Sequence, residues 1–101
     1  MRTIFYGVVE EEKKRNLERQ QIYQEEIGTL PRGYLNVKKT KGIEYYYLQR
    51  RNGQRFVSTY IGNDIQKVDE IKKQIAKRKH YEELIKKLKL EYKQMCKVVK
   101  E

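Results

Sequence analysis

Between residues 34 and 62 the sequence contains three β-prone runs, each ended by a break that contains glycine. These breaks are Gly42, Asn52-Gly53 and Gly62. Asn-Gly between two β-prone runs favours a two-residue hairpin loop, because a type I′ turn needs positive φ at both central positions and these residues tolerate it best. The sequence therefore predicts a three-stranded antiparallel meander over residues 34–61.

A polar helix is predicted before the meander, over residues 8–28. This segment is rich in Glu, Gln, Lys and Arg, and Gly28 and Pro31 end it. Its apolar positions make only a rough helical stripe, formed by Val9, Leu17, Tyr23 and Ile27. A helix of this kind can cover a sheet with one thin apolar face.

A second helix is predicted after the meander, over residues 63–100. It opens with an N-cap signal at Asn63-Asp64 and contains neither Gly nor Pro. The pattern allows one long helix or two collinear helices with a kink at residues 77–80. We therefore expect one α+β domain over residues 1–101, built as helix, meander and long helix.

Alternation along the strands sorts their side chains onto two faces. A loop at Asn52-Gly53 places Arg51 opposite Gln54 and Tyr47 opposite Ser58. The apolar face, which we assign to the core, carries Leu35, Val37, Tyr46, Leu48, Val57 and Ile61. The opposite face mixes aromatic, polar and cationic residues: Tyr34, Asn36, Lys38, Thr40, Tyr45, Tyr47, Gln49, Arg51, Gln54, Phe56, Ser58 and Tyr60.

The charge of the chain indicates a polyanionic partner. Lys and Arg number 24 against 14 Asp and Glu, a formal net charge of +10 at pH 7. The excess is uneven, with −1 over residues 1–28, +6 over residues 29–62 and +5 over residues 63–101. A basic protein of this size attracts nucleic acid at low salt.

The mixed face of the sheet has the chemistry that nucleic acid needs. Cations neutralise phosphates, aromatic rings stack on bases, and Asn or Gln can reach base edges. We predict a non-enzymatic protein that binds nucleic acid, DNA above all, or a nucleoprotein. The predicted contact residues are Tyr34, Asn36, Lys38, Lys39, Lys41, Tyr45, Tyr47, Gln49, Arg50, Arg51, Arg55, Phe56 and Tyr60. The alternative is structural, because cross-strand tyrosines stabilise sheets and a helix could cover this face.

The chain lacks the residues that most metal sites and catalytic sites require. His80 is the single histidine and Cys96 the single cysteine, so we expect no metal site, no cofactor and no intramolecular disulfide. Gly-rich phosphate loops and nucleophile elbows are absent. We expect no enzymatic activity, no membrane span, and a reducing location such as a bacterial cytoplasm, or the host cytoplasm for a phage-encoded protein.

A heptad-like stripe runs through the second helix, at Tyr81, Ile85, Leu88, Tyr92, Met95 and Val99. Packing against the sheet or the first helix of the same chain is one interpretation. The other is a homodimer through a short coiled coil, in a self-associating scaffold. Two tyrosines in the seam weaken the coiled-coil interpretation.

Three segments resemble a family of short, poorly characterised prokaryotic and mobile-element proteins: Leu30–Leu35 (LPRGYL), Tyr45–Arg51 (YYYLQRR) and Tyr60–Gly62 (YIG). The usual pattern of that family is similar to LPKGSL, then YYYLQYR, then YIG, with a helix on either side. Tyr34 stands where a small residue is usual, and the basic tail to Glu101 is long. The resemblance covers about residues 10–80 and implies the fold more than an activity.

Two further likenesses concern function. The sheet-then-helix order is similar to the arm-binding domains of phage-type tyrosine integrases, which implies DNA as the ligand. A free-standing basic protein of this size is also similar in kind to phage- and plasmid-encoded inhibitors of CRISPR effector nucleases. Binding to such a nuclease is the alternative function, because inhibitors of this class gain from charge complementary to their target.

Overall fold

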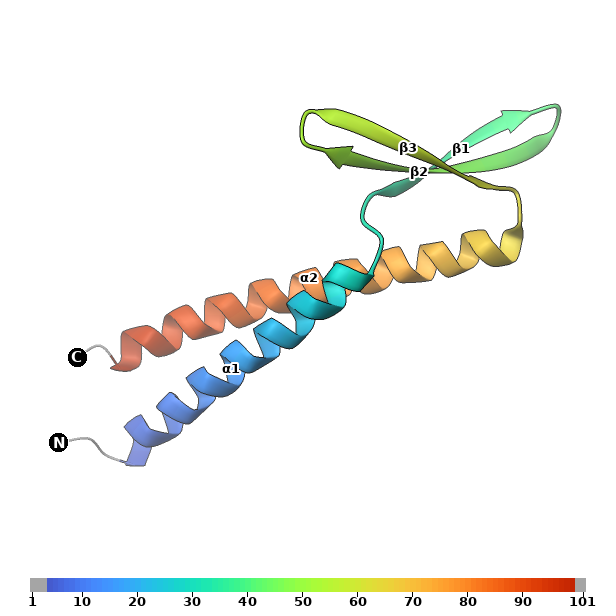
Figure 1. The fold of residues 1–101 in the computed structure, drawn as a ribbon. Helices are drawn as coiled ribbons and strands as arrows, with labels where there is room; N and C mark the ends of the chain where they lie inside the picture. Colours follow the sequence, from blue (N-terminus) through green and yellow to red (C-terminus); the bar gives the residue numbers. More distant parts are fainter. Residues whose placement is uncertain (1–3, 100–101) are drawn as a thin grey trace. The chain divides into compact units, whose positions relative to one another are not determined.

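The computed structural model describes residues 4–99, which form two helices and three strands (Figure 1). The elements are α1 (Ile4–Thr29), β1 (Tyr34–Thr40), β2 (Ile43–Asn52), β3 (Arg55–Gly62) and α2 (Ile65–Val99). The predicted α+β fold with its β-meander is confirmed. Helix α2 continues without a break through residues 77–80, and the predicted helical position at Lys100 lies outside the described residues.

The chain divides into two compact units. Residues 30–79 form the sheet unit, which holds β1, β2, β3 and the first part of α2. The helical unit consists of α1 and the remainder of α2, which are residues 4–29 and 80–99 of the described chain.

The sheet has the order β1-β2-β3, with both pairs antiparallel. The β1-β2 turn is Lys41-Gly42, whose φ values of 52° and 81° are both positive, as a type I′ turn requires. The β2-β3 loop is Gly53-Gln54, because Asn52 pairs with Arg55. Of these two loop residues only Gly53 has positive φ, at 65°, which is the arrangement of a type II′ turn.

The predicted register of the second hairpin is therefore wrong by two residues. Arg51 pairs with Phe56 instead of Gln54, and Tyr47 pairs with Tyr60 instead of Ser58. The cause is that Asn52 belongs to β2 and Gly53 takes the first turn position, where positive φ is required. A shift of two residues preserves the faces, since side chains alternate with a period of two.

Helix α2 begins at a cap provided by Asp64. The Asp64 carboxylate accepts a 3.0 Å hydrogen bond from the backbone N–H of Gln66, and the Asp64 carbonyl accepts one from Val68. Asp64 is therefore the N-cap residue, the second residue of the Asn63-Asp64 signal predicted from the sequence. Val68, which is 2 % exposed, is the best-buried apolar side chain of the sheet unit.

The loop from residue 30 into β1 lies against α2 at one end and against β2 at the other. The Arg78 guanidinium donates a 2.8 Å hydrogen bond to the carbonyl oxygen of Leu30. Gly33 has a φ of 112°, and a Cβ at this position would clash with the backbone carbonyl of Gln49. Only glycine fits there, which gives a physical reason for the glycine of the LPRGYL segment.

Helices α1 and α2 pack antiparallel in the helical unit. Contacts join Tyr23 to Tyr81, Asn16 to Leu88, and Lys13 to Tyr92. Along this series the α1 residue number falls while the α2 number rises by nearly the same amount, which is the register of antiparallel helices. The best-buried apolar side chains of the unit are Ile27, Ile85 and Leu88, at 8 %, 5 % and 9 % exposed.

The α1 side of this contact differs from the predicted stripe. Leu17 is 47 % exposed, so its predicted place in the stripe is wrong. The residues that face α2 recur at alternating spacings of four and three, as in a heptad, and three of them are polar. They are Val9, Lys13, Asn16, Gln20, Tyr23 and Ile27. Polar seam residues are invisible to a search for apolar periodicity, which explains the error.

Candidate nucleic-acid interface

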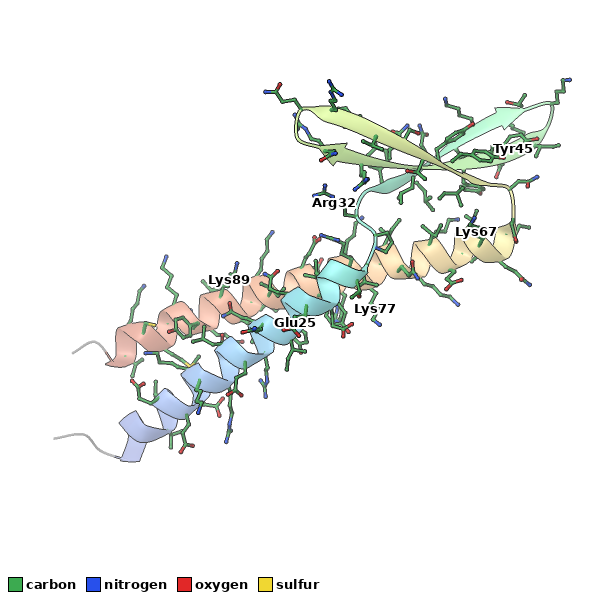
Figure 2. The ribbon with its side chains drawn as sticks, in the orientation of Figure 1. Glu25, Arg32, Tyr45, Lys67, Lys77 and Lys89 are labelled. Atoms are coloured by element: carbon green, nitrogen blue, oxygen red, sulfur yellow. The ribbon has the colours of Figure 1, made fainter. Side chains whose placement is uncertain are left out.

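The strand pairing places most of the predicted contact residues on one face of the sheet, called the outer face here. Rows of paired residues cross the sheet: Tyr34, Gln49 and Ser58; Asn36, Tyr47 and Tyr60; Lys38 and Tyr45; and Arg51 and Phe56. Tyr45 of β2, which is labelled in Figure 2, is one of these outer-face residues. The opposite, inner face carries the half-buried Leu35, Tyr46, Leu48 and Val57.

Aromatic rings lie close together on the outer face, where Tyr45 and Tyr47 are half-buried and Phe56 and Tyr60 are exposed. Tyr47 and Tyr60 have ring centroids 5.3 Å apart, and Tyr45 and Tyr60 have centroids 6.4 Å apart. Phe56 is 70 % exposed and Tyr60 is 57 % exposed. Rings that a helix covered would be buried, so this face is open within the sheet unit.

Two cations lie over these rings. Lys38 Nζ is 5.0 Å from the centroid of Tyr47, and the guanidinium carbon of Arg51 is 5.7 Å from the centroid of Phe56. The Arg51 Nε also donates a hydrogen bond to the carbonyl oxygen of Gly53. These contacts place positive charge beside stacking surfaces, which is the combination that binds single strands and exposed bases.

Four predicted cations do not belong to the outer face. Alternation directs Lys39, Arg50 and Arg55 to the other side of their strands, where they pair with Glu44, Val57 and Asn52. Lys41 lies in the β1-β2 turn. All four are exposed, so they add positive charge to the sheet unit without forming part of the outer face.

The positive charge of the chain is concentrated in the sheet unit. Residues 30–79 contain 13 Lys and Arg against four Asp and Glu, a formal charge of +9. The remaining residues, 1–29 and 80–101, contain 11 Lys and Arg against ten Asp and Glu, a charge of +1. Almost the whole net charge of +10 thus lies in the unit that carries the aromatic face.

A hollow that the sequence did not indicate opens at the β1 edge of the sheet unit. It has a volume of about 300 Å³. Its lining combines an aromatic ring, aliphatic side chains and two lysines: Tyr34, Leu35, Lys72, Ile75, Ala76 and Lys79. Tyr34 is 54 % exposed and also belongs to the outer face, so the hollow continues that surface around the sheet edge. These residues come from β1 and α2, and they meet only because the two elements lie side by side in the folded sheet unit.

The inner face contains one hydrogen-bonded ionisable pair. The Tyr46 hydroxyl donates a 3.2 Å hydrogen bond to the Glu44 carboxylate, and Lys72 Nζ lies 5.4 Å from the Tyr46 ring centroid. This hydrogen bond raises the pKa of Tyr46 above its ordinary value, aided by partial burial and by the charges of Glu44 and Asp69. Tyr46 is therefore neutral at physiological pH.

The predicted dimer seam lies in the helical unit, where its residues face α1 of the same chain. Tyr81 stacks on Tyr23, and Tyr92 lies under Lys13. Ile85 and Leu88 are buried, and Met95 is half-buried. A homodimer through these five residues stays a prediction, and the side chain of Val99 lies outside the described part.

Within residues 4–99, no group of three or more His, Cys, Asp or Glu residues is arranged to hold a metal ion. Cys96 is a half-buried free thiol. Over the same residues, neither helix is both long and apolar enough to cross a lipid bilayer.

Residues 9–73 match a protein family described as "Domain of unknown function (DUF6788)". This match covers more than half of the chain, and it includes most of α1, the whole sheet and the start of α2. The chain belongs to the DUF6788 family. No curated protein and no solved structure matches it.

Proposed function

We propose that this protein binds nucleic acid, without catalysis, through the outer face of its sheet. The observation that carries the proposal is the pairing of cations with aromatic rings of the outer face, Lys38 with Tyr47 and Arg51 with Phe56. The cation neutralises a phosphate while the ring beside it stacks on the adjoining base. Neither role requires a movement of the backbone.

The distribution of charge supports the same surface. A protein that used its charge only for solubility could spread it over both units, whereas the sheet unit carries +9 and the rest of the chain +1. Lys39, Lys41, Arg50 and Arg55 lie off the outer face, are exposed, and add long-range attraction for phosphates beyond the direct contacts. Such long-range attraction steers a polyanion toward the aromatic rows.

The hollow at the β1 edge extends the path available to the ligand. A strand that crosses the outer face toward Tyr34 reaches Lys72 and Lys79, whose ammonium groups suit a phosphate. The aliphatic lining from Leu35 and Ile75 suits the face of a base. DNA is the favoured ligand, on the likeness of the sheet-then-helix order to integrase arm-binding domains.

The test is fluorescence anisotropy with labelled duplex DNA, single-stranded DNA and structured RNA over a salt series. The double variant Lys38→Glu with Arg51→Glu removes both cation–ring pairs. The matched control is Lys86→Glu with Lys89→Glu, which makes the same change in net charge on exposed residues of the helical unit. We expect roughly tenfold or greater weakening in the first variant and much less in the control.

Equal weakening by both variants would show that net charge alone drives binding and that the outer face is not the site. Failure to bind any of these ligands at low salt would refute direct nucleic-acid binding. The alternative partner is then a nucleoprotein such as a CRISPR effector nuclease, with this chain as its phage-encoded inhibitor. Co-elution with a guide-loaded nuclease, insensitive to competitor DNA, would support that alternative.

A further inference from the structure

An open groove runs along one side of the helical unit, between α1 and the final part of α2. Its volume is about 320 Å³. It is lined by Val9, Glu12, Asn16, Arg19, Leu88, Glu91, Gln94, Met95 and Val98. Four of these side chains are apolar, Asn16 and Gln94 are amides, and Glu12, Arg19 and Glu91 are charged. A groove between two packed helices is the place where a third helix would lie.

On α1, exposed apolar side chains are more numerous beside the groove than on the other side of the helix. On α1, Val8 and Ile22 are helical neighbours of the groove residues Glu12 and Arg19, at spacings of four and three. They are 51 % and 55 % exposed. Leu17, 47 % exposed, lies on the other side of the α1 seam.

The same asymmetry holds on α2. Leu84, Glu91 and Val98 are seven residues apart and therefore share one side of the helix. Leu84 is half-buried and Val98 is 40 % exposed. Leu90, which is 60 % exposed, points away from the groove by its heptad position.

The two helices bury little between themselves. Among the described side chains of the helical unit, those less than one-tenth exposed are Asn16, Ile27, Ile85 and Leu88. Lys13 and Gln20 occupy two further positions of the contact between α1 and α2, where a well-packed pair of helices would have apolar side chains. Most helical stability in proteins comes from packing an apolar face, and this pair leaves its groove side unpacked.

We propose that the groove side of the helical unit docks on a second copy of this chain, forming a four-helix bundle. The charges along the groove favour a second copy over another partner. The groove border carries both signs, and Glu12 already pairs with Arg15 of its own chain at 2.9 Å, so Arg19 of one copy can pair with Glu91 of the other. The helical unit is nearly neutral, so two copies can approach there without the repulsion of the sheet units.

The available area suits a dimer. The paired region spans residues 80–99 of α2, about 30 Å of helix at 1.5 Å per residue. Two helices packed 8–10 Å apart present a face about 20 Å wide, hence roughly 600 Å² per copy and ~1,200 Å² in total. This estimate reaches the lower limit for a stable specific interface.

The test is the mass of the full chain in solution, by sedimentation equilibrium at micromolar concentrations. We expect twice the chain mass of 12.4 kDa. The variant Val8→Glu with Ile22→Glu should return the protein to the monomer, because it places four carboxylates in the interface of two copies. The matched control, Leu17→Glu with Leu90→Glu, changes charge and exposed apolar area similarly and should remain a dimer.

Far-UV circular dichroism at each step shows whether the helices persist in the variants. A wild-type mass of 12.4 kDa would overturn the proposal without any variant. Equal dissociation by the control variant, or a larger assembly that Val8→Glu with Ile22→Glu does not reduce, would also overturn it. A second measurement on the wild type is the melting temperature, which should rise with protein concentration if dimerisation stabilises the helices. The inference is independent of the ligand of the outer face.

Discussion

The side-chain amide of Asn16 donates a 2.8 Å hydrogen bond to the backbone carbonyl oxygen of Leu88, which lies in the middle of α2. The Asn16 amide oxygen in turn accepts a 2.6 Å hydrogen bond from Gln20. Asn16 is only 4 % exposed, so its bond to Leu88 is shielded from water. A buried amide with one matching carbonyl fixes which turn of α2 lies against which turn of α1.

We predict that Asn16→Ala lowers the free energy of unfolding by about 1–2 kcal/mol, because it removes this bond and leaves the Gln20 amide without its acceptor. Urea unfolding followed by far-UV circular dichroism measures the change. Glu18→Ala, at an exposed position of the same helix, is the control and should stay within about 0.5 kcal/mol of the wild type. An Asn16→Ala effect no larger than that of Glu18→Ala would contradict the role of the bond.

The polar seam also explains why the face of α1 that contacts α2 could not be predicted from the sequence. Heptad spacing on α2 is visible because its seam is apolar or aromatic, from Tyr81 to Met95. The matching spacing on α1 passes through Lys13, Asn16 and Gln20, which a hydrophobicity search discards. Such a search therefore selects Leu17, which is exposed. The helix was predictable, but the face it uses was not.

Gly33 offers a test of the loop that leads into β1. We predict that Gly33→Ala destabilises the protein by about 2–3 kcal/mol or more, because alanine strains a φ of 112° and its Cβ would meet the Gln49 carbonyl. The control is Gly28→Ala, in α1, where a Cβ meets no atom within 4 Å. It should stabilise the protein by about 0.5–1 kcal/mol, through the higher helix propensity of alanine. Near-identical urea midpoints for the two variants would contradict this account.

The hairpin at Asn52-Gly53 shows what a turn motif can and cannot predict. The motif correctly predicts a tight turn between two strands, but it permits loops of different register. Asn can be the first turn residue, or it can end the strand and leave that place to Gly, as it does here. Lys41-Gly42 adopts the type I′ φ values although lysine is a poor candidate for them. The side chains of this hairpin still lie on the predicted faces of the sheet, because the register differs from the prediction by two residues, an even number.

Phe56 tests whether the open rings of the sheet contact a ligand. We predict that Phe56→Ala weakens nucleic-acid binding by between about five- and a hundredfold, the range for loss of one base-stacking ring. The fold should persist, because the side chain is 70 % exposed. Ile65→Ala is the matched control, since Ile65 is 74 % exposed at the start of α2 and lies off the outer face. Anisotropy titrations measure both, and equal effects would exclude stacking on Phe56.

The Tyr46–Glu44 hydrogen bond gives a prediction for alkaline pH. Because the raised pKa of Tyr46 reflects a neutral hydroxyl bound to Glu44, the contact contributes stability below the unfolded pKa of tyrosine. That contribution is lost as pH rises through the folded pKa. We expect Glu44→Gln to lower the pKa of Tyr46 and Asp69→Asn to lower it less, since the charge of Asp69 is the smallest cause. NMR titration of the Tyr46 ring measures both, and the reverse order would contradict the assignment.

Lys38 provides the last prediction, which concerns salt. A lysine that neutralises one phosphate releases the counterions of that phosphate, so its removal changes the slope of log affinity against log salt. We expect Lys38→Gln to reduce the magnitude of this slope by about 0.9 on duplex DNA or about 0.7 on a single strand. Lys89→Gln, at an exposed position of the helical unit, should leave the slope unchanged. Weaker binding by Lys38→Gln at an unaltered slope would mean that Lys38 supports the Tyr47 ring, 5.0 Å away, and does not touch phosphate.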